Sequence, residues 1–242
     1  MIKFKYILIA CAFLTPIFSS CRDCVQGSGV LLSENRTSQV SDFTELEANS
    51  DFDVYITIDS ITQVLVEGDD NIVPYIKTYL KGDRLVLENR SSKCFKYDQR
   101  MEVHVRTPYV DKVVLNGSGN IYCDNWGFTN SLLSLVNAGS GKLSFSNIIT
   151  DDFKAELMGS GNIALSGSSD YADYSLSGSG SIKGINFNVD ECYINTSGSG
   201  NVYVYFNDKL TIDLYGSGSV YFNGNVNKVF VNNRGSGIVR ED

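Results

Sequence analysis

In the second half of the chain, apolar residues alternate with polar ones in short runs, and these runs recur at a nearly constant interval. In each run an aliphatic residue stands two positions after a Gly-Ser-Gly triplet, and the positions four and six before the triplet are mostly apolar. Alternation at every second position is typical of a β-strand that buries one face. The pattern therefore predicts a strand on each side of every triplet. The aliphatic residues after the triplets, predicted to lie in the core, are Ile121, Leu143, Ile163, Ile182, Val202, Val220 and Val239.

The triplet occurs seven times, and its central serines are separated by 22, 20, 19, 20, 18 and 19 residues. A repeat of this length is typical of a solenoid, in which each rung packs on its neighbours. We therefore expect an all-β fold, a single-stranded β-helix, and the general crossover preference favours a right-handed coil. Glycine corners let stacked backbones approach closely and permit positive φ. The predicted corner glycines are Gly117, Gly119, Gly139, Gly141, Gly159, Gly161, Gly178, Gly180, Gly198, Gly200, Gly216, Gly218, Gly235 and Gly237.

The preceding segment, 41–115, has no such repeat but is rich in alternating apolar residues, as in 52–58 and 101–106. It predicts further strands and one short helix around 71–77, together covering the first rung of the solenoid. We expect 41–242 to form one domain, irregular over 41–115 and regular over 116–242. Little sequence follows the last triplet, and an uncovered strand edge invites pairing with another chain. Either Arg240, Glu241 and Asp242 protect this edge by their charge, or the edge forms the interface of a homo-oligomer.

The first 20 residues resemble a secretory signal. Lys3 and Lys5 precede an apolar run over 6–18 that is too short to span a bilayer comfortably. Phe18-Ser19-Ser20-Cys21 resembles a bacterial lipobox, which predicts cleavage before Cys21 and lipid attached to it, with 21–40 as a tether. Several acyl chains would hold the protein firmly at a membrane of the cell envelope, and we expect the outer membrane. Simple secretion with Cys21 unmodified is the alternative.

The net charge and the cysteines of the chain limit the classes of ligand and cross-link that are expected. The net charge of −8 argues against binding to nucleic acid. Export would permit disulfides, and Cys24 and Cys94 lie outside the regular repeats, so they could pair. Cys123 and Cys192 fall on inward-facing positions and are predicted to be core residues. Processing would remove Cys11 and modify Cys21, and the four remaining cysteines lack the Cys-x-x-Cys or Cys/His spacing of a zinc site, so no metal is expected.

Candidate catalytic chemistry is sparse. His104 is the only histidine, and its strand pattern places it outward beside Glu102 and Arg106. A solvated position is favoured over a catalytic one, because a Ser/His/Asp triad would have to use this residue. Aspartates recur in the turns opposite the corners, where Asp is a good turn former, and a glycan-active enzyme would need them as catalysts. The triplets also lack the form of a phosphate-binding loop. We expect a protein that is not an enzyme and has no cofactor.

The predicted contact surface is aromatic. By alternation, Tyr203, Tyr205 and Tyr221 point outward from adjacent rungs and form a patch with asparagine neighbours. Exposed tyrosines suit a sugar ring or a protein partner, because the ring stacks and the hydroxyl forms hydrogen bonds. Stacking between rungs that only stabilises the sheet is the alternative.

The order of several segments resembles a known family. These segments are Phe43-Thr44-Glu45-Leu46, Asp53-Val54-Tyr55-Ile56, the run 64–72, Leu85-Val86-Leu87 and the run 113–121 with the first triplet. Together with the repeated triplets they are similar to the putative auto-transporter adhesin, head GIN domain family. The resemblance implies a β-helix-like fold and a role in cell adhesion, and it supplies no catalytic residues. The leading hypothesis is an envelope lipoprotein that acts as a non-enzymatic binding module; a self-associating structural protein and a glycan-active enzyme are the alternatives.

Overall fold

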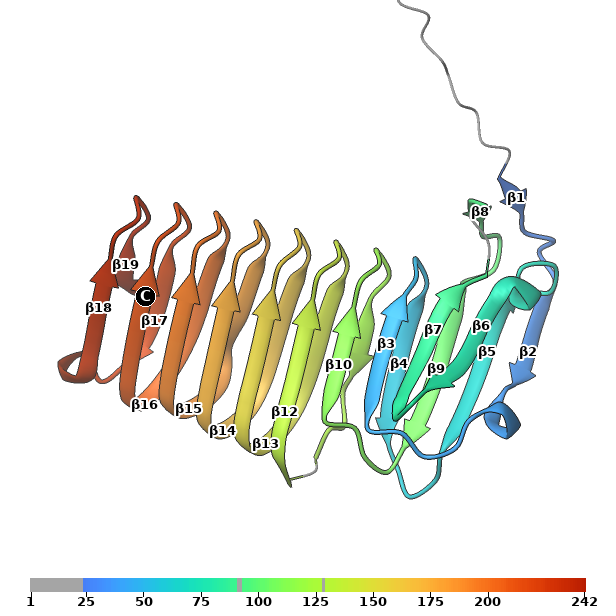
Figure 1. The fold of residues 1–242 in the computed structure, drawn as a ribbon, viewed down its shortest axis with the longest axis horizontal. Coiled ribbons are helices and arrows are strands. Elements are labelled where there is room, and N and C mark those ends of the chain that lie inside the picture. The colour runs from blue at the N-terminus through green and yellow to red at the C-terminus, as the bar shows by residue number, and fades with distance from the viewer. Residues whose placement is uncertain (1–23, 91–92, 128) are drawn as a thin grey trace, which may run out of the picture.

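The computed structural model describes residues 24–90, 93–127 and 129–242. These residues form strands and three 3-10 helices of three residues each, so the expected all-β class is confirmed. In Figure 1 the strands stack side by side along one long axis, with the corners in a row at the top. In the described part of the chain, none of the helices is long and apolar enough to cross a bilayer. The predicted signal peptide, 1–20, and the predicted lipidation site, Cys21, lie outside the described residues.

The regular half is a parallel solenoid whose rungs each cross two faces. The long strands β13 to β16 run from one corner to the next; the first part of β13 pairs with β11, and its last part pairs with β12. We call the face that leads into the corners the pre-corner sheet and the face that leaves them the post-corner sheet. The strands of this half are β10 (Lys112–Leu115), β11 (Ile121–Cys123), β12 (Thr129–Asn137), β13 (Lys142–Leu157), β14 (Asn162–Leu176), β15 (Ser181–Thr196), β16 (Asn201–Leu214), β17 (Val220–Gly224), β18 (Val229–Asn233) and β19 (Val239–Glu241).

The core fills the space between the two sheets, as the alternation predicts. The aliphatic residues two positions after the corners are fully buried from Ile121 to Val220, whereas Val239 in the last rung is only partly buried. Larger side chains fill the wider parts, and the rings of Phe153 and Phe187 lie 4.8 Å apart. Each such side chain contributes roughly 1.5–3 kcal/mol by leaving water. The stack of rungs therefore has one continuous core.

The corner glycines are required by space. A Cβ atom on any of them would lie 1.6–2.1 Å from a backbone oxygen of the preceding rung. The corner glycines do not have the positive φ that the sequence permitted. The described glycines with positive φ are Gly29, Gly82, Gly127, Gly167 and Gly224. The central serines all point outward and are exposed. Close contact between rungs, without unusual backbone torsion, fixes the corner sequence.

Parallel rungs continue into the half that was expected to be irregular. β3 (Glu45–Asn49) pairs with both β10 and β7 (Arg84–Asn89), and β4 (Asp53–Ile58) pairs with both β11 and β9 (Glu102–Thr107). β3 and β4 thus lie between strands that come later in the chain (Figure 1). Ser50 and Phe52 stand where other rungs have the corner glycines, and their carbonyl oxygens approach Gly117 and Gly119.

Antiparallel strands cover this end of the solenoid. β6 (Ile76–Lys81) pairs with β7, and β5 (Gln63–Asp69) pairs with both β9 and β2 (Leu31–Asn35). The short helix predicted around 71–77 is reduced to the 3-10 helix η2 (Val73–Tyr75), because the chain continues as β6 directly after it. An end cap was expected here, and its antiparallel pairing distinguishes it from the parallel rungs.

The predicted tether is shorter than 21–40. Its described part, 24–40, contains β1 (Val25–Gln26), β2 and the 3-10 helix η1 (Thr37–Gln39). β1 pairs in parallel with β8 (Phe95–Lys96), which lies between β7 and β9 in the chain. Leu32 of β2 packs against the core. This segment therefore covers apolar surface and is part of the cap.

Candidate functional site

The outer face of the post-corner sheet carries one row of side chains in register across the rungs. Aromatic residues occupy both ends of the row, and short side chains occupy its middle. From Tyr55 the row continues through Tyr122, Ser144, Ala164, Lys183, Tyr203 and Tyr221. The aromatic rings therefore form two separate groups on a flat surface.

The C-terminal group contains the three tyrosines predicted as ligand contacts. The rings of Tyr203 and Tyr221 are stacked at 5.0 Å with an angle of 11°, and the Arg240 guanidinium lies 5.4 Å from the other face of Tyr221. Both rings are half-buried, so this pair matches the alternative reading, in which tyrosines stabilise the sheet across rungs. Tyr205 is 38% exposed and lies between Asn188 and Asn223 in register. Of the three, Tyr205 offers the freest ring.

The N-terminal group was not predicted as a site. Tyr55 is stacked between His104 and Tyr122, each ring 5.2 Å away, at angles of 15° and 21°. The next residue in the row after Tyr122 is Ser144, whose side chain is too short to cover the ring. Burial raises the pKa of the Tyr122 phenol, and the neighbouring Asp53 raises it further. Tyr122 therefore presents a neutral hydroxyl and one uncovered ring face.

A hollow of about 470 Å³ adjoins this group. Its walls combine tyrosine rings with carboxylates, an amide and a guanidinium. The Tyr97 hydroxyl donates a 2.7 Å hydrogen bond to Asp51. Burial is the main cause that raises the pKa of Tyr97, and this hydrogen bond raises it further. Rings that stack, beside groups that donate and accept hydrogen bonds, suit a polyhydroxylated ligand. The polar and aromatic lining residues include Asp51, Asp53, Tyr55, Tyr97, Gln99, Arg100, Glu102 and Tyr122.

Buried Asp69 holds the loop that forms one wall of this hollow. Its carboxylate accepts hydrogen bonds from the backbone N–H groups of Gly29, Asp98 and Gln99 at 2.8, 2.9 and 3.1 Å. Burial raises the pKa of Asp69, but the three N–H groups outweigh it and the pKa is lowered. An ionised Asp69 therefore fixes the wall relative to the cap.

The disulfide between Cys24 and Cys94 lies in the same region. Their Cα atoms are 4.7 Å apart, and the bond connects segments next to β1 and β8. Cys123 and Cys192 are buried and are not disulfide-bonded. Burial raises the pKa of the Cys123 thiol to about 12, so it stays protonated at neutral pH.

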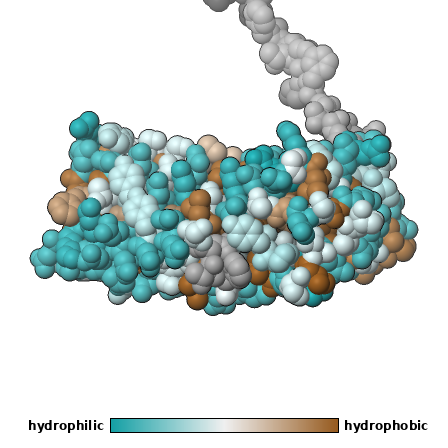
Figure 2. Space-filling view, turned by 60° about the horizontal axis from the view of Figure 1, so that its bottom comes forward, coloured by the Kyte–Doolittle hydropathy of each residue, from teal (hydrophilic) through white to brown (hydrophobic). Residues whose placement is uncertain are grey.

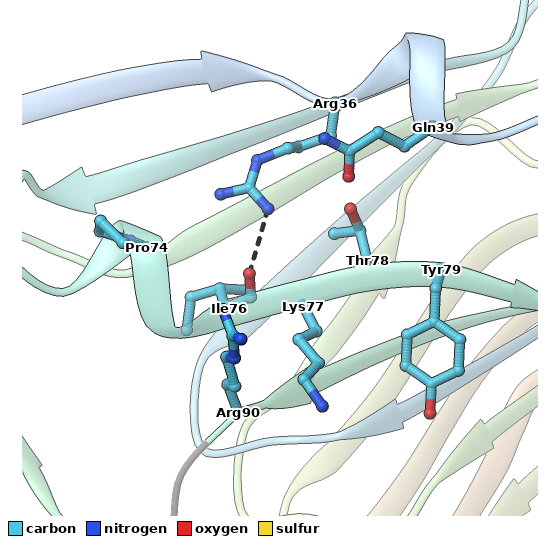
Figure 3. Close-up of a pocket in the computed structure, with 8 residues that line it drawn as sticks. All are labelled: Arg36, Gln39, Pro74, Ile76, Lys77, Thr78, Tyr79 and Arg90. Carbon is cyan, nitrogen blue, oxygen red and sulfur yellow. Dashed lines mark hydrogen bonds between the residues drawn. The ribbon is translucent and has the colours of Figure 1, made fainter.

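A second hollow, of about 400 Å³, lies beside the free edge of β6 (Figure 3). Arg36 reaches into it and donates hydrogen bonds to the carbonyl oxygens of Ile76 and Val73 at 3.1 and 3.3 Å. The Arg36 guanidinium also forms an ion pair with Glu34, with an Nε–Oε1 distance of 2.7 Å, and the carboxylate compensates its positive charge. Arg36 thus completes the cap at the edge of β6.

The turn aspartates gather at the edge opposite the corners. Asp170, Asp190 and Asp208 line a shallow depression together with Tyr171 and Glu191. Two of these aspartates already have partners, since Asp190 accepts a 2.8 Å hydrogen bond from Asn207, and Asp208 pairs with Lys228. The side of the molecule in Figure 2, turned toward this edge, is mostly hydrophilic, with small separate hydrophobic spots. This arrangement agrees with solvated turns.

Solved structures of similar fold include proteins described as putative adhesins. A putative adhesin from Bacteroides fragilis aligns with a TM-score of 0.84 at 22% identity, covering 90% of this chain and 100% of that one. A putative adhesin from Parabacteroides distasonis gives a TM-score of 0.68 at 22% identity, covering 91% of this chain and 100% of that one. A putative lipid binding protein from the same species gives a TM-score of 0.68 at 19% identity, covering 90% and 99%. At these identities the likeness shows a shared fold.

The sequence also matches one family directly. None of the curated proteins matches the chain. The family profile described as putative auto-transporter adhesin, head GIN domain, matches residues 42–226, which is most of the chain. This span includes the hollow, both tyrosine groups and all but the last corner. The resemblance indicated by the sequence motifs is thereby confirmed, and the chain belongs to the putative auto-transporter adhesin, head GIN domain family.

Proposed function

We propose that this protein is an exported, lipid-anchored binding module of the cell envelope that acts as a non-enzymatic adhesin. Its partner contacts the outer face of the post-corner sheet, and the hollow beside Tyr55 and Tyr122 favours a glycan. The observation that carries this proposal is the uncovered ring of Tyr122 next to a hollow lined by carboxylates, an amide and a guanidinium. Membership of an adhesin family supports it.

The geometry favours shallow contact at more than one place. Tyr122 and Tyr203 are separated in the row by Ser144, Ala164 and Lys183. Neighbouring strands are about 4.8 Å apart, so four steps correspond to roughly 19 Å. An extended oligosaccharide could lie across the short side chains and contact tyrosines at both ends. Two weak contacts on one ligand reinforce each other when both can be made together.

The N-terminal segment supports the anchoring part of the proposal. The motif Phe18-Ser19-Ser20-Cys21 precedes the domain, and the described chain begins at Cys24 beside the cap. A lipid on Cys21 would hold the cap end near the membrane and leave the other rungs extending from it. The anchor is proposed for the outer membrane.

The binding proposal is tested with a panel of immobilised oligosaccharides and the purified full-length chain. Tyr122→Ala and Tyr205→Ala each remove one ring from the two tyrosine groups, and Tyr79→Ala is the matched control. Tyr79 is 38% exposed, like Tyr205, but lies on β6. We expect Tyr122→Ala to weaken binding by about tenfold or more, since a tenfold change corresponds to about 1.4 kcal/mol. Wild-type protein that binds no glycan, or loses binding equally with all three variants, would contradict the proposal.

Self-association through the C-terminal edge is the second candidate function. Phe230, Val231 and Ile238 on the last rung are 57%, 47% and 51% exposed. Apolar side chains on a strand edge favour pairing with another chain. A second copy placed on this edge would extend both sheets and cover these residues.

A further inference from the structure

Three carboxylates lie in one row on the outer face of the cap. Glu102 of β9 is directly opposite Glu67 of β5 on one side and Asp53 of β4 on the other. Like charges placed opposite each other in a sheet destabilise it. Asp53 accepts hydrogen bonds from the backbone and side-chain N–H groups of Asn120 at 3.0 and 2.8 Å. Glu67 and Glu102 are left as a facing pair.

The positive charge beside this pair is weak. The Arg100 guanidinium lies 3.8 Å from Glu102, but the Arg100 side chain is 86% exposed. An exposed ion pair of this kind is worth little. Arg100 therefore compensates little of the repulsion between the Glu67 and Glu102 carboxylates, and a further cation between them would be stabilising.

His104 completes the cluster on the same face. Its Nε2 atom lies 3.5 Å from Glu67 Oε2 and 3.4 Å from Glu102 Oε2. One ligand atom from each of the three residues falls within 4.8 Å of the others. The stacked ring of Tyr55, 5.2 Å away at 15°, holds the imidazole in this orientation. The side chains are 20–37% exposed, so an ion can reach them from solvent.

We propose that Glu67, Glu102 and His104 bind a divalent transition metal, with Zn²⁺ as the best fit. Zinc lies about 2.0–2.2 Å from imidazole nitrogen and carboxylate oxygen, so neighbouring ligands at a tetrahedral site are about 3.3–3.5 Å apart. The two distances from His104 Nε2 fall in this range without any movement of the strands. Calcium and magnesium prefer a shell of oxygen ligands, and the imidazole therefore selects against them.

The site leaves one coordination position for another ligand. Three protein ligands and one open position are typical of zinc sites that also bind water or a substrate atom. Glu102 belongs both to this cluster and to the wall of the hollow beside Tyr55. A bound Zn²⁺ would balance the charges of the two carboxylates and place an open coordination position at the margin of the hollow. This inference stands apart from glycan binding, because metal binding can be measured without any glycan.

No metal was expected from the sequence, because that expectation rested on Cys/His spacing, whereas these ligands come from two strands far apart in the chain. A protonated His104 that bridges the two carboxylates as a simple ion pair would show the same distances. The two cases differ in their response to zinc. They are therefore separated by a binding measurement.

The experiment uses the purified full-length chain after removal of metals with a chelator. Isothermal titration with ZnCl₂ is performed on wild type, His104→Asn, Glu67→Gln and the control Glu156→Gln. Glu156 lies on β13, away from the cluster. We expect His104→Asn to lose one zinc equivalent. Glu67→Gln should weaken zinc binding by more than the roughly 10–100-fold that is typical for loss of a residue supporting a metal ligand. The control should bind zinc as wild type does.

Thermal unfolding with and without zinc provides a second readout that does not depend on counting sites. A ligand that binds only the native state raises the melting temperature. We expect zinc to raise it for wild type and Glu156→Gln, and to have a smaller effect on His104→Asn and Glu67→Gln. Equal zinc stoichiometry and affinity in wild type and both cluster variants would overturn the proposal and leave the ion pair. So would a wild-type melting temperature that zinc does not raise.

Discussion

A Cβ atom on Gly141 would lie 1.7 Å from the carbonyl oxygen of Gly119, its counterpart in the preceding rung. The two corners cannot separate independently, because β10 pairs with β12 before them and β11 pairs with β13 after them. The triplet therefore sets how closely the rungs stack.

Replacement of Gly141 by alanine should destabilise the whole solenoid. The added methyl group meets backbone, which cannot rotate away, and overpacking of this kind costs about 1–3 kcal/mol or more. Ser140→Ala in the same corner is the control, because Ser140 is exposed and its replacement should cost less than about 0.5 kcal/mol. Denaturant unfolding of both variants measures the difference. Equal stability of the two variants would show that the corner can relax.

Asp69 should make the cap sensitive to acid. Its pKa is lowered in the folded state, so it contributes stability above its ordinary value of 3.8, and this contribution is lost as the pH falls through the folded pKa. Asp69→Asn should lower the free energy of unfolding by about 2 kcal/mol at pH 7, because charge-assisted hydrogen bonds are lost. Below pH 4 the difference between wild type and variant should shrink. A difference that is constant from pH 7 to pH 3 would contradict this role.

The four cysteines within the described residues should fall into two chemical classes. Alkylation of the native protein at pH 8 should label neither Cys123 nor Cys192, because burial raises the pKa of both thiols. Denaturation alone should expose these two, whereas Cys24 and Cys94 should be labelled only after reduction. Peptide mass spectrometry assigns each label. Labelling of Cys24 or Cys94 without a reductant would contradict the disulfide.

The last rung should govern any self-association. Light scattering of the wild type should show a mass that rises with concentration, and Val239→Pro should abolish this rise by disrupting β19. Ile238→Asp tests the same edge with less disturbance, because Ile238 is already 51% exposed; Ile61→Asp, 47% exposed and outside the last rung, is its control. A wild-type mass that stays monomeric at every concentration would remove the second candidate function.

The sequence predicted the regular half well because every rung repeats the same offsets. Stacking in register keeps Leu143 and Ile163 equivalent in space as they are in the alignment, so one pattern places a whole row of the core. The position of β3 could not be predicted in this way. Its partner Lys112 is 67 residues from Glu45, and the alternation of a strand does not reveal which neighbour it pairs with.

The residues of the candidate site were likewise predicted in the half of the chain with triplets and missed in the half without them. Tyr203 and Tyr221 were placed side by side because both stand at the same offset from a corner. Tyr55 and Tyr97 were missed because their part of the chain has no Gly-Ser-Gly triplet to align, although Tyr122 at the common offset was a usable signal. The facing of Glu67 and Glu102 depends on the register of β5 and β9, and η2, β6, β7 and β8 lie between these strands in the chain, so no hairpin turn sets that register.

An adhesin must meet its partner outside the cell, so the solenoid must be exposed on the surface of intact cells. The decisive measurement is protease shaving of intact cells that produce wild type or Cys21→Ala, with detection of fragments from the solenoid. We expect wild-type solenoid to be cut from the outside, and the Cys21→Ala protein to leave the membrane fraction. Protection of the wild type until the outer membrane is opened would contradict an adhesin and place the domain in the periplasm.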